Sequence, residues 1–159
     1  MANTYTQIHI QYVFAVKFRD AVITQEWEER LHQYMTGIVQ KYNHKVLAIN
    51  GMPDHVHILV GMRPTQAPSD LMEQLKSSSS KWINEEKFLK TKFAWQDGFS
   101  AFSYTKSHVQ TVIRYIFHQI PFSNLLTFSD IHLKMRPFYD VPFDLKYIES
   151  QFVHVILYN

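Results

Sequence analysis

Two histidines stand one residue apart in the segment MPDHVHILV, residues 52–60. The residues around them are apolar and mostly branched, which is typical of a buried strand. Because strand side chains alternate between faces, His55 and His57 point to the same side, about 7 Å apart along the strand. Two imidazoles at this spacing can converge on one metal ion. They can equally be ordinary polar residues on a half-exposed strand, and the pair alone does not decide.

A second candidate group lies in the segment RYIFHQI, residues 114–120. Tyr115 and Gln119 are four residues apart, so they share one face of a predicted helix. The tyrosine hydroxyl is a nucleophile, and the glutamine amide oxygen is a neutral ligand for a hard or borderline cation. With the two histidines they describe a metal-assisted attack on a phosphodiester that leaves a phosphotyrosine. The alternative for Tyr115 is packing at the rim of the core.

The elements that would position the first group follow from hydrophobic periodicity. Alternating apolar and polar residues from Thr4 to Phe18 predict a strand, and the helical period that follows predicts a helix with Thr24 as its N-cap. Residues 45–52 predict a second strand, and Pro53 and Asp54 separate it from the histidine strand.

The second group is preceded by a helix and a strand. Ser69 or Asp70 is expected to cap a helix that contains the run KSSSSK at 76–81, and a fourth strand is expected within 93–104. Ser107 and Gln110 form a capping-box pattern that predicts the start of the last helix.

This order of elements predicts an α+β, ferredoxin-like fold. The β-α-β-β-α-β core forms an antiparallel sheet with helices on one face, and a C-terminal catalytic helix follows. Val56, Ile58 and Val60 should face the helices, which places His55 and His57 on the open face. We expect a single domain over residues 1–159 with its core at about 5–120.

The composition indicates a globular protein but does not identify its function. The chain of 159 residues is 46% apolar and 19% charged, which is typical of a globular domain. The formal charge of +2 is too small to indicate nucleic-acid binding by itself. The absence of cysteine is consistent with a cytoplasmic location, and neither a signal peptide nor a membrane span is predicted.

Four blocks together resemble the single-tyrosine HUH transposases of small insertion sequences, the IS200-like family. The resemblance runs in order over about residues 5–120. The blocks are MPDHVHILV (52–60), LKSSSSKWIN (75–84), FAWQDGFSAFS (93–103) and YIFHQ (115–119).

The resemblance implies a DNA transposase that cuts and rejoins single-stranded DNA with hairpin ends. By matching positions, Tyr115 is the nucleophile that takes a 5′-phosphate, and His55, His57 and Gln119 are the ligands of Mg²⁺ or Mn²⁺. It also implies a homodimer in which the tyrosine helix of one subunit completes the histidine site of the other. Five lysines are candidate phosphate contacts or simply a solvated face. They are Lys76, Lys81, Lys87, Lys90 and Lys92.

The segment after Gln119 departs from the family pattern. Residues 120–137 lack the expected charge and helical period, and residues 139–148 look family-like again, so we treat 121–159 as a divergent C-terminal segment. The leading interpretation remains the transposase, and the alternative is a domesticated or inactive relative that binds single-stranded or hairpin DNA without mobilising it. A relaxase or replication initiator, a non-catalytic single-strand binder and a zinc hydrolase on the two histidines are further alternatives.

Overall fold

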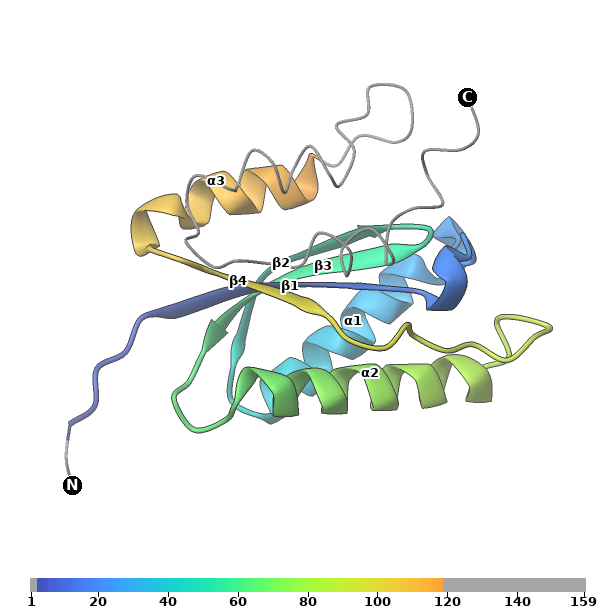
Figure 1. Ribbon diagram of the computed structural model, residues 1–159, viewed down its shortest axis with the longest axis horizontal. Helices are drawn as coiled ribbons and strands as arrows, with labels where there is room; N and C mark the ends of the chain where they lie inside the picture. The colour runs from blue at the N-terminus through green and yellow to red at the C-terminus, as the bar shows by residue number, and fades with distance from the viewer. Residues whose placement is uncertain (1–2, 119–159) are drawn as a thin grey trace. The chain divides into compact units, whose positions relative to one another are not determined.

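The computed structural model describes residues 3–118 of the chain, and they form a four-stranded antiparallel sheet with helices packed on it (Figure 1). The strand order is β2-β3-β1-β4, which is the ferredoxin-like arrangement expected from the sequence. In chain order the elements are β1 (Ile8–Ala15), a 3-10 turn (Lys17–Arg19), α1 (Gln25–Lys41), β2 (Lys45–Met52), β3 (His55–Met62), α2 (Pro68–Glu85), β4 (Ser100–Tyr104) and α3 (Lys106–Phe117).

The helices lie on both faces of the sheet, with α1 and α2 on one side and α3 on the other (Figure 1). The larger core lies between the sheet and α1 and α2, and it includes Val56, Ile58 and Val60, as the alternation predicts. A smaller core joins α3 to the other face of the sheet. Its buried members are Ala48, Leu59, Val109, Val112 and Ile116. The face that bears the histidines is therefore covered by α3 over part of its area.

Strand register sets which residues become neighbours of the histidines. His57 on β3 is paired with Val13 on β1 and with Asn50 on β2. Gly51, the next residue on β2, lies so close to β3 that a Cβ atom there would stand 2.5 Å from the backbone oxygen of His55. Any side chain at position 51 would therefore displace the start of the histidine strand.

The helix starts differ from two of the sequence predictions. Helix α2 begins at Pro68 after Ala67, ahead of the predicted caps Ser69 and Asp70. Proline suits this first position because its missing N–H would have no partner there. Helix α3 begins after Thr105, so the predicted cap Ser107 lies inside the helix. Thr24 does occupy the N-cap position of α1, although its side chain makes no capping hydrogen bond.

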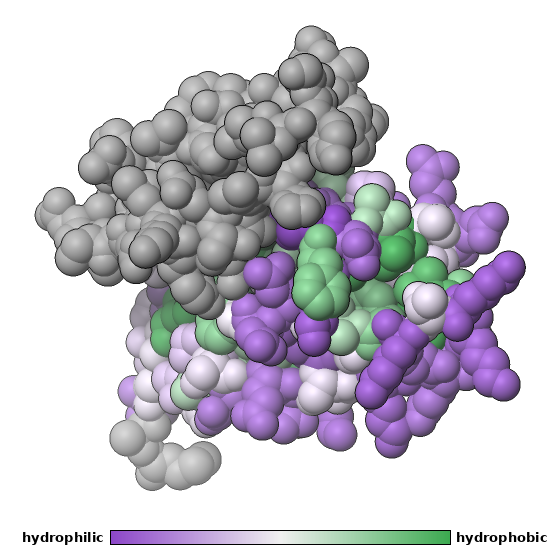
Figure 2. Space-filling model, turned by 45° about the vertical axis from the view of Figure 1, so that its right-hand side comes forward, coloured by the Kyte–Doolittle hydropathy of each residue, from purple (hydrophilic) through white to green (hydrophobic). Residues whose placement is uncertain are grey.

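On the face shown in Figure 2, hydrophilic side chains form much of the visible surface of the described residues, with hydrophobic areas between them. Large hydrophobic side chains are exposed at Tyr5, Phe18 and Phe117. None of the helices between residues 3 and 118 combines the length and apolar character needed to cross a membrane.

His32 on α1 makes folding stability depend on pH. Burial lowers the pKa of His32 to about 4, and its Nε2 atom is buried without a hydrogen-bond partner among the residues the structure describes. The ordinary value is 6.5, so between about pH 6.5 and pH 4 the unfolded chain binds a proton that the folded chain does not. Stability therefore falls as the pH falls through this window.

We expect His32 to lower the free energy of unfolding by about 1–2 kcal/mol when the pH is lowered from 8 to 5. Urea unfolding of the wild type and of His32→Leu at both pH values, with EDTA present, measures the difference. The loss on acidification should be smaller in His32→Leu by that amount. His118→Leu, which replaces an exposed histidine, should lose as much stability as the wild type. Equal losses in all three proteins would contradict the assignment to His32.

Candidate active site

His55 and His57 lie side by side on β3, as the alternation predicts. Their ring centroids are 5.1 Å apart, with the ring planes inclined at 62°. The side chain of His55 is 14% exposed and His57 is 2% exposed, so His57 is buried on this strand. Two rings at this separation can bind one ion, because the centroid of an imidazole lies about 3 Å from a metal bound at its nitrogen.

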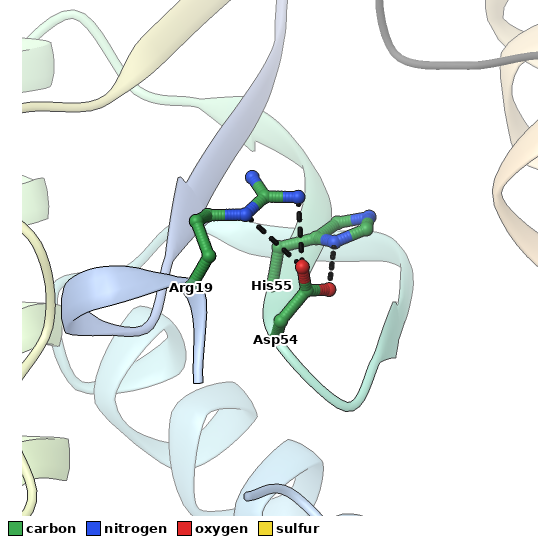
Figure 3. Close-up of polar contacts among 3 residues, drawn as sticks. All are labelled: Arg19, Asp54 and His55. Atoms are coloured by element: carbon green, nitrogen blue, oxygen red, sulfur yellow. Dashed lines mark hydrogen bonds and ion pairs between the residues drawn. The ribbon is translucent and has the colours of Figure 1, made fainter. Parts of the chain in front are cut away.

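A partly buried ion pair fixes the orientation of His55 (Figure 3). Nδ1 of His55 lies 2.7 Å from Oδ1 of Asp54, and Arg19 reaches Oδ2 of Asp54 with its Nε and Nη2 atoms at 3.0 and 2.8 Å. Burial alone would raise the pKa of Asp54, but the hydrogen bond and charge of His55 and the charge of Arg19 lower it below its usual value.

The charge on Asp54 determines the tautomer of His55. A carboxylate only accepts hydrogen bonds, so Nδ1 of His55 must carry the proton and donate it. In the neutral ring the lone pair is then on Nε2, which is the form that binds a metal.

The backbone that carries Arg19 adopts an unusual conformation. Phe18 and Arg19 have φ angles of 61° and 57°, in the left-handed region that residues with side chains rarely adopt. The turn is held because the N–H of Val16 donates to the carbonyl of Asp54 at 2.8 Å and the N–H of Arg19 donates to the carbonyl of Val16 at 2.9 Å. Strained backbone of this kind persists where the surrounding structure requires it. Here it directs the guanidinium of Arg19 towards Asp54.

A neutral side chain, Gln11, contacts His57 and is itself bonded to Tyr104. Nε2 of Gln11, on β1, lies 2.9 Å from Nδ1 of His57, and the hydroxyl of Tyr104, on β4, donates to Oε1 of Gln11 at 2.8 Å. Gln11 is only 2% exposed. The two histidines thus have different partners, a charged carboxylate for His55 and an amide for His57.

Helix α3 brings Tyr115 to His57 within one chain. The ring centroids of Tyr115 and His57 are 6.0 Å apart. The helix is positioned by the smaller core and by Asn50, whose Nδ2 donates to the carbonyl of Ile116 at 2.9 Å. Since Asn50 pairs with His57 across the strands, the same residue of β2 neighbours the histidine and holds the turn of α3 that carries the tyrosine.

The set of possible metal ligands is incomplete within the described residues. Residues 3–118 contain no cluster of three or more His, Cys, Asp or Glu side chains able to hold a metal. Gln119, the third predicted ligand, lies outside the described residues, as do residues 121–159. The two histidines nevertheless suit a metal, because the ion pair leaves Nε2 of His55 with its lone pair and His57 stands next to it.

The five lysines belong to α2 and the segment after it, the layer on the opposite face of the sheet from His57 (Figure 1). Nζ of Lys76 donates to the carbonyls of Gln96 and Gly98, both at 2.6 Å, and so holds the loop that leads into β4. Lys81 lies 3.7 Å from Glu85 one turn along the helix. The remaining three, Lys87, Lys90 and Lys92, are exposed. Their contact with DNA stays a prediction.

The residues that hold the histidines were not identified from the sequence. Asp54 carries a visible signal, because it immediately precedes His55, but the pattern Pro53–Asp54 indicates only a turn. Gln11 lies on the same face of its strand as His9, and nothing in the sequence states which residue of β3 it will meet. Arg19, Asn50 and Tyr104 likewise depend on the register of the sheet and on the path of the chain.

A comparison with protein families matches most of the described chain. The family described as "Transposase IS200 like" matches residues 4–119. The ISDra2 transposase TnpA of Deinococcus radiodurans is 31% identical over 75 residues. That alignment covers 47% of this chain and 54% of the relative, so it spans about half of the length of that protein.

Two solved structures share the fold. The crystal structure of a proposed transposase from Deinococcus radiodurans R1 superposes with a TM-score of 0.60 at 22% identity, covering 75% of this chain and 96% of that one. The structure of a REP-associated tyrosine transposase bound to a REP hairpin superposes with a TM-score of 0.55 at 13% identity. It covers 74% of this chain and 69% of that one.

Proposed function

Because the chain belongs to the IS200-like transposase family, we propose that it cleaves and rejoins single-stranded DNA through a covalent 5′-phosphotyrosine at Tyr115. The observation that carries the proposal is the meeting of three side chains from separate positions in the sequence. The ring of Tyr115 lies 6.0 Å from that of His57, which in turn lies 5.1 Å from that of His55. A nucleophile beside two side chains able to hold a metal supports a metal-assisted phosphodiester transfer.

In the proposed step, the phenolic oxygen of Tyr115 attacks the phosphorus of one phosphodiester. A Tyr–O–P bond forms and the P–O3′ bond breaks, so the 5′-phosphate stays on the protein. The 3′-oxygen leaves and takes up a proton, while the phenol loses its own. Rejoining is the reverse reaction, with a 3′-hydroxyl attacking the phosphotyrosine. The ester retains the bond energy, so no nucleotide is consumed.

His55 and His57 would hold Mg²⁺ or Mn²⁺, with Gln119 as a third ligand. The ion would act as a Lewis acid on the phosphate oxygens. The chain's own contribution is orientation. The pair of Arg19 and Asp54 holds His55 in the tautomer that binds a metal, and Asn50 holds the turn of α3 that carries Tyr115.

The proposed partner is single-stranded DNA with hairpin ends. One structural relative is described as bound to a REP hairpin, which supports this class of partner. We also propose a homodimer. Within the described chain, Tyr115 lies next to His57 of the same chain. Sharing of the site between two subunits stays a prediction. The cytoplasmic location also stays a prediction.

The test is a denaturing gel of the full chain incubated with labelled single-stranded DNA from the flanks of its own gene. With Mg²⁺ or Mn²⁺, a protein–DNA band should survive SDS, and it should disappear with EDTA. Peptide mass spectrometry of the band should locate the nucleotide on Tyr115. Binding of the same DNA without any adduct would contradict the enzyme and favour the alternative, a relative that binds DNA without mobilising it.

A further inference from the structure

Gln11 contacts His57 on one side and Tyr104 on the other. In the structure its Nε2 atom lies 2.9 Å from Nδ1 of His57, and its Oε1 atom accepts the hydroxyl proton of Tyr104 at 2.8 Å. An amide nitrogen only donates, so Nδ1 of His57 is the acceptor and carries no proton. The proton of the neutral ring is then on Nε2.

This tautomer conflicts with metal binding through Nε2. A ligand nitrogen must present a lone pair, and metal-bound histidines usually donate their other ring N–H to an oxygen. His55 already satisfies this requirement, because its Nδ1 faces the carboxylate of Asp54 at 2.7 Å. His57 satisfies it only if its Nδ1 carries the proton and finds an oxygen acceptor.

A half-turn of the Gln11 amide supplies that acceptor. It exchanges the oxygen and the nitrogen, so Oε1 faces Nδ1–H of His57 and Nε2 faces Tyr104. The hydroxyl of Tyr104 tolerates both arrangements, because it can donate to the amide oxygen or accept from the amide nitrogen. A buried group that loses its partner costs free energy, and here neither orientation leaves the amide unpaired.

We propose that Gln11 is a positioning residue whose amide reverses when the metal binds, and that this reversal sets the tautomer of His57. The inference rests on the proposed metal centre. It makes the two ligands unequal: His55 is held ready by a fixed carboxylate, whereas His57 becomes a ligand when its amide partner turns. Gln11, with Tyr104 behind it, therefore contributes to metal affinity without touching the ion.

The first measurement uses the unaltered full chain with ¹⁵N-labelled histidine. Long-range ¹H–¹⁵N correlations show which ring nitrogen of each histidine carries the proton. We expect His57 to be protonated on Nε2 without metal and on Nδ1 when saturated with Mg²⁺, while His55 is protonated on Nδ1 in both states. A proton on Nδ1 of His57 in both states would overturn the reversal.

The second measurement is Mn²⁺ affinity, followed by electron paramagnetic resonance of the free ion. Gln11→Met keeps the length of the side chain but removes the acceptor, and affinity should fall about 10- to 100-fold, the usual effect of losing such a partner. Gln66→Met is the matched control. Gln66 bonds a ring nitrogen of a different buried histidine, His44, at 2.8 Å, at the far end of β3. The Gln66→Met substitution should leave Mn²⁺ affinity unchanged.

The outcomes separate the inference from the proposed function. Equal affinity in the wild type, Gln11→Met and Gln66→Met, with clear binding by all three, would overturn the role of Gln11 alone. Equal loss in both variants would assign the effect to general destabilisation and would also overturn it. Absence of Mn²⁺ binding by the wild type would overturn the metal centre on which both proposals rest.

Discussion

Replacing Tyr115 with phenylalanine is expected to abolish the covalent protein–DNA adduct while leaving the fold intact. Only one oxygen is removed, and it is the atom that would attack phosphorus. The ring stays, so its packing against the core of α3 and its position 6.0 Å from His57 are retained. The melting temperature should therefore move by a few degrees at most, while adduct formation on a denaturing gel falls below detection.

Tyr34→Phe is the matched control for this substitution. Its ring stacks on Trp82 at 4.6 Å on the α1 and α2 side of the sheet, so its hydroxyl is remote from the histidines. This variant should form the adduct as the wild type does. Both variants should bind single-stranded DNA with wild-type affinity in fluorescence anisotropy. An adduct of normal yield in Tyr115→Phe would show that another residue is the nucleophile.

The fold could be predicted because local patterns and global architecture agree. The structure buries the apolar residues that alternate along β1 and β3 and those that recur at helical spacing in α1 and α3. The order of the elements then leaves few possible topologies. The helix caps at Ser69 and Ser107 were wrong because several polar residues near each start satisfy the same pattern. In α2 the N-cap position is Ala67, followed by Pro68 as the first helical residue, and in α3 the N-cap is Thr105.

The sequence indicates the candidate chemical residues of the site but not the residues that orient them. The histidine pair and Tyr115 stand out because their types are unusual in their surroundings. The residues that orient them do not, because Gln11 and Asn50 are placed by cross-strand register, which is a property of the pairing and not of either strand. Arg19 reaches Asp54 through a left-handed turn that sequence patterns do not indicate for phenylalanine and arginine.

Helix α3 covers part of the face that bears the histidines, so a substitution at His57 changes a buried position. His57 is 2% exposed and hydrogen-bonded, so its removal affects both chemistry and folding. A loss of activity in a single variant would not separate these effects. The chain offers a second buried histidine for comparison. His44 is 4% exposed, and its two ring nitrogens contact the N–H of Arg63 at 3.0 Å and the side chain of Gln66 at 2.8 Å.

His57→Ala and His44→Ala should destabilise the protein to a similar extent and differ in activity. Each removes a buried imidazole and leaves a glutamine side chain without its partner, at a cost of about 1–3 kcal/mol. Only His57→Ala removes a proposed metal ligand, so metal-dependent cleavage of single-stranded DNA should fall by more than about 100-fold in that variant. Cleavage by His44→Ala should stay near the wild-type rate at a temperature where both variants are folded.

Urea unfolding, fluorescence anisotropy with DNA, and initial cleavage rates at several Mn²⁺ concentrations measure the three quantities. His57→Ala should still bind DNA, because the phosphate and base contacts do not require this imidazole. Normal cleavage by His57→Ala would remove the metal assignment from this residue. A matching loss in His44→Ala would instead mean that activity follows stability. Both histidines are buried and both contact a glutamine side chain, so a difference in cleavage between the variants would come from the position of His57 beside His55 and Tyr115.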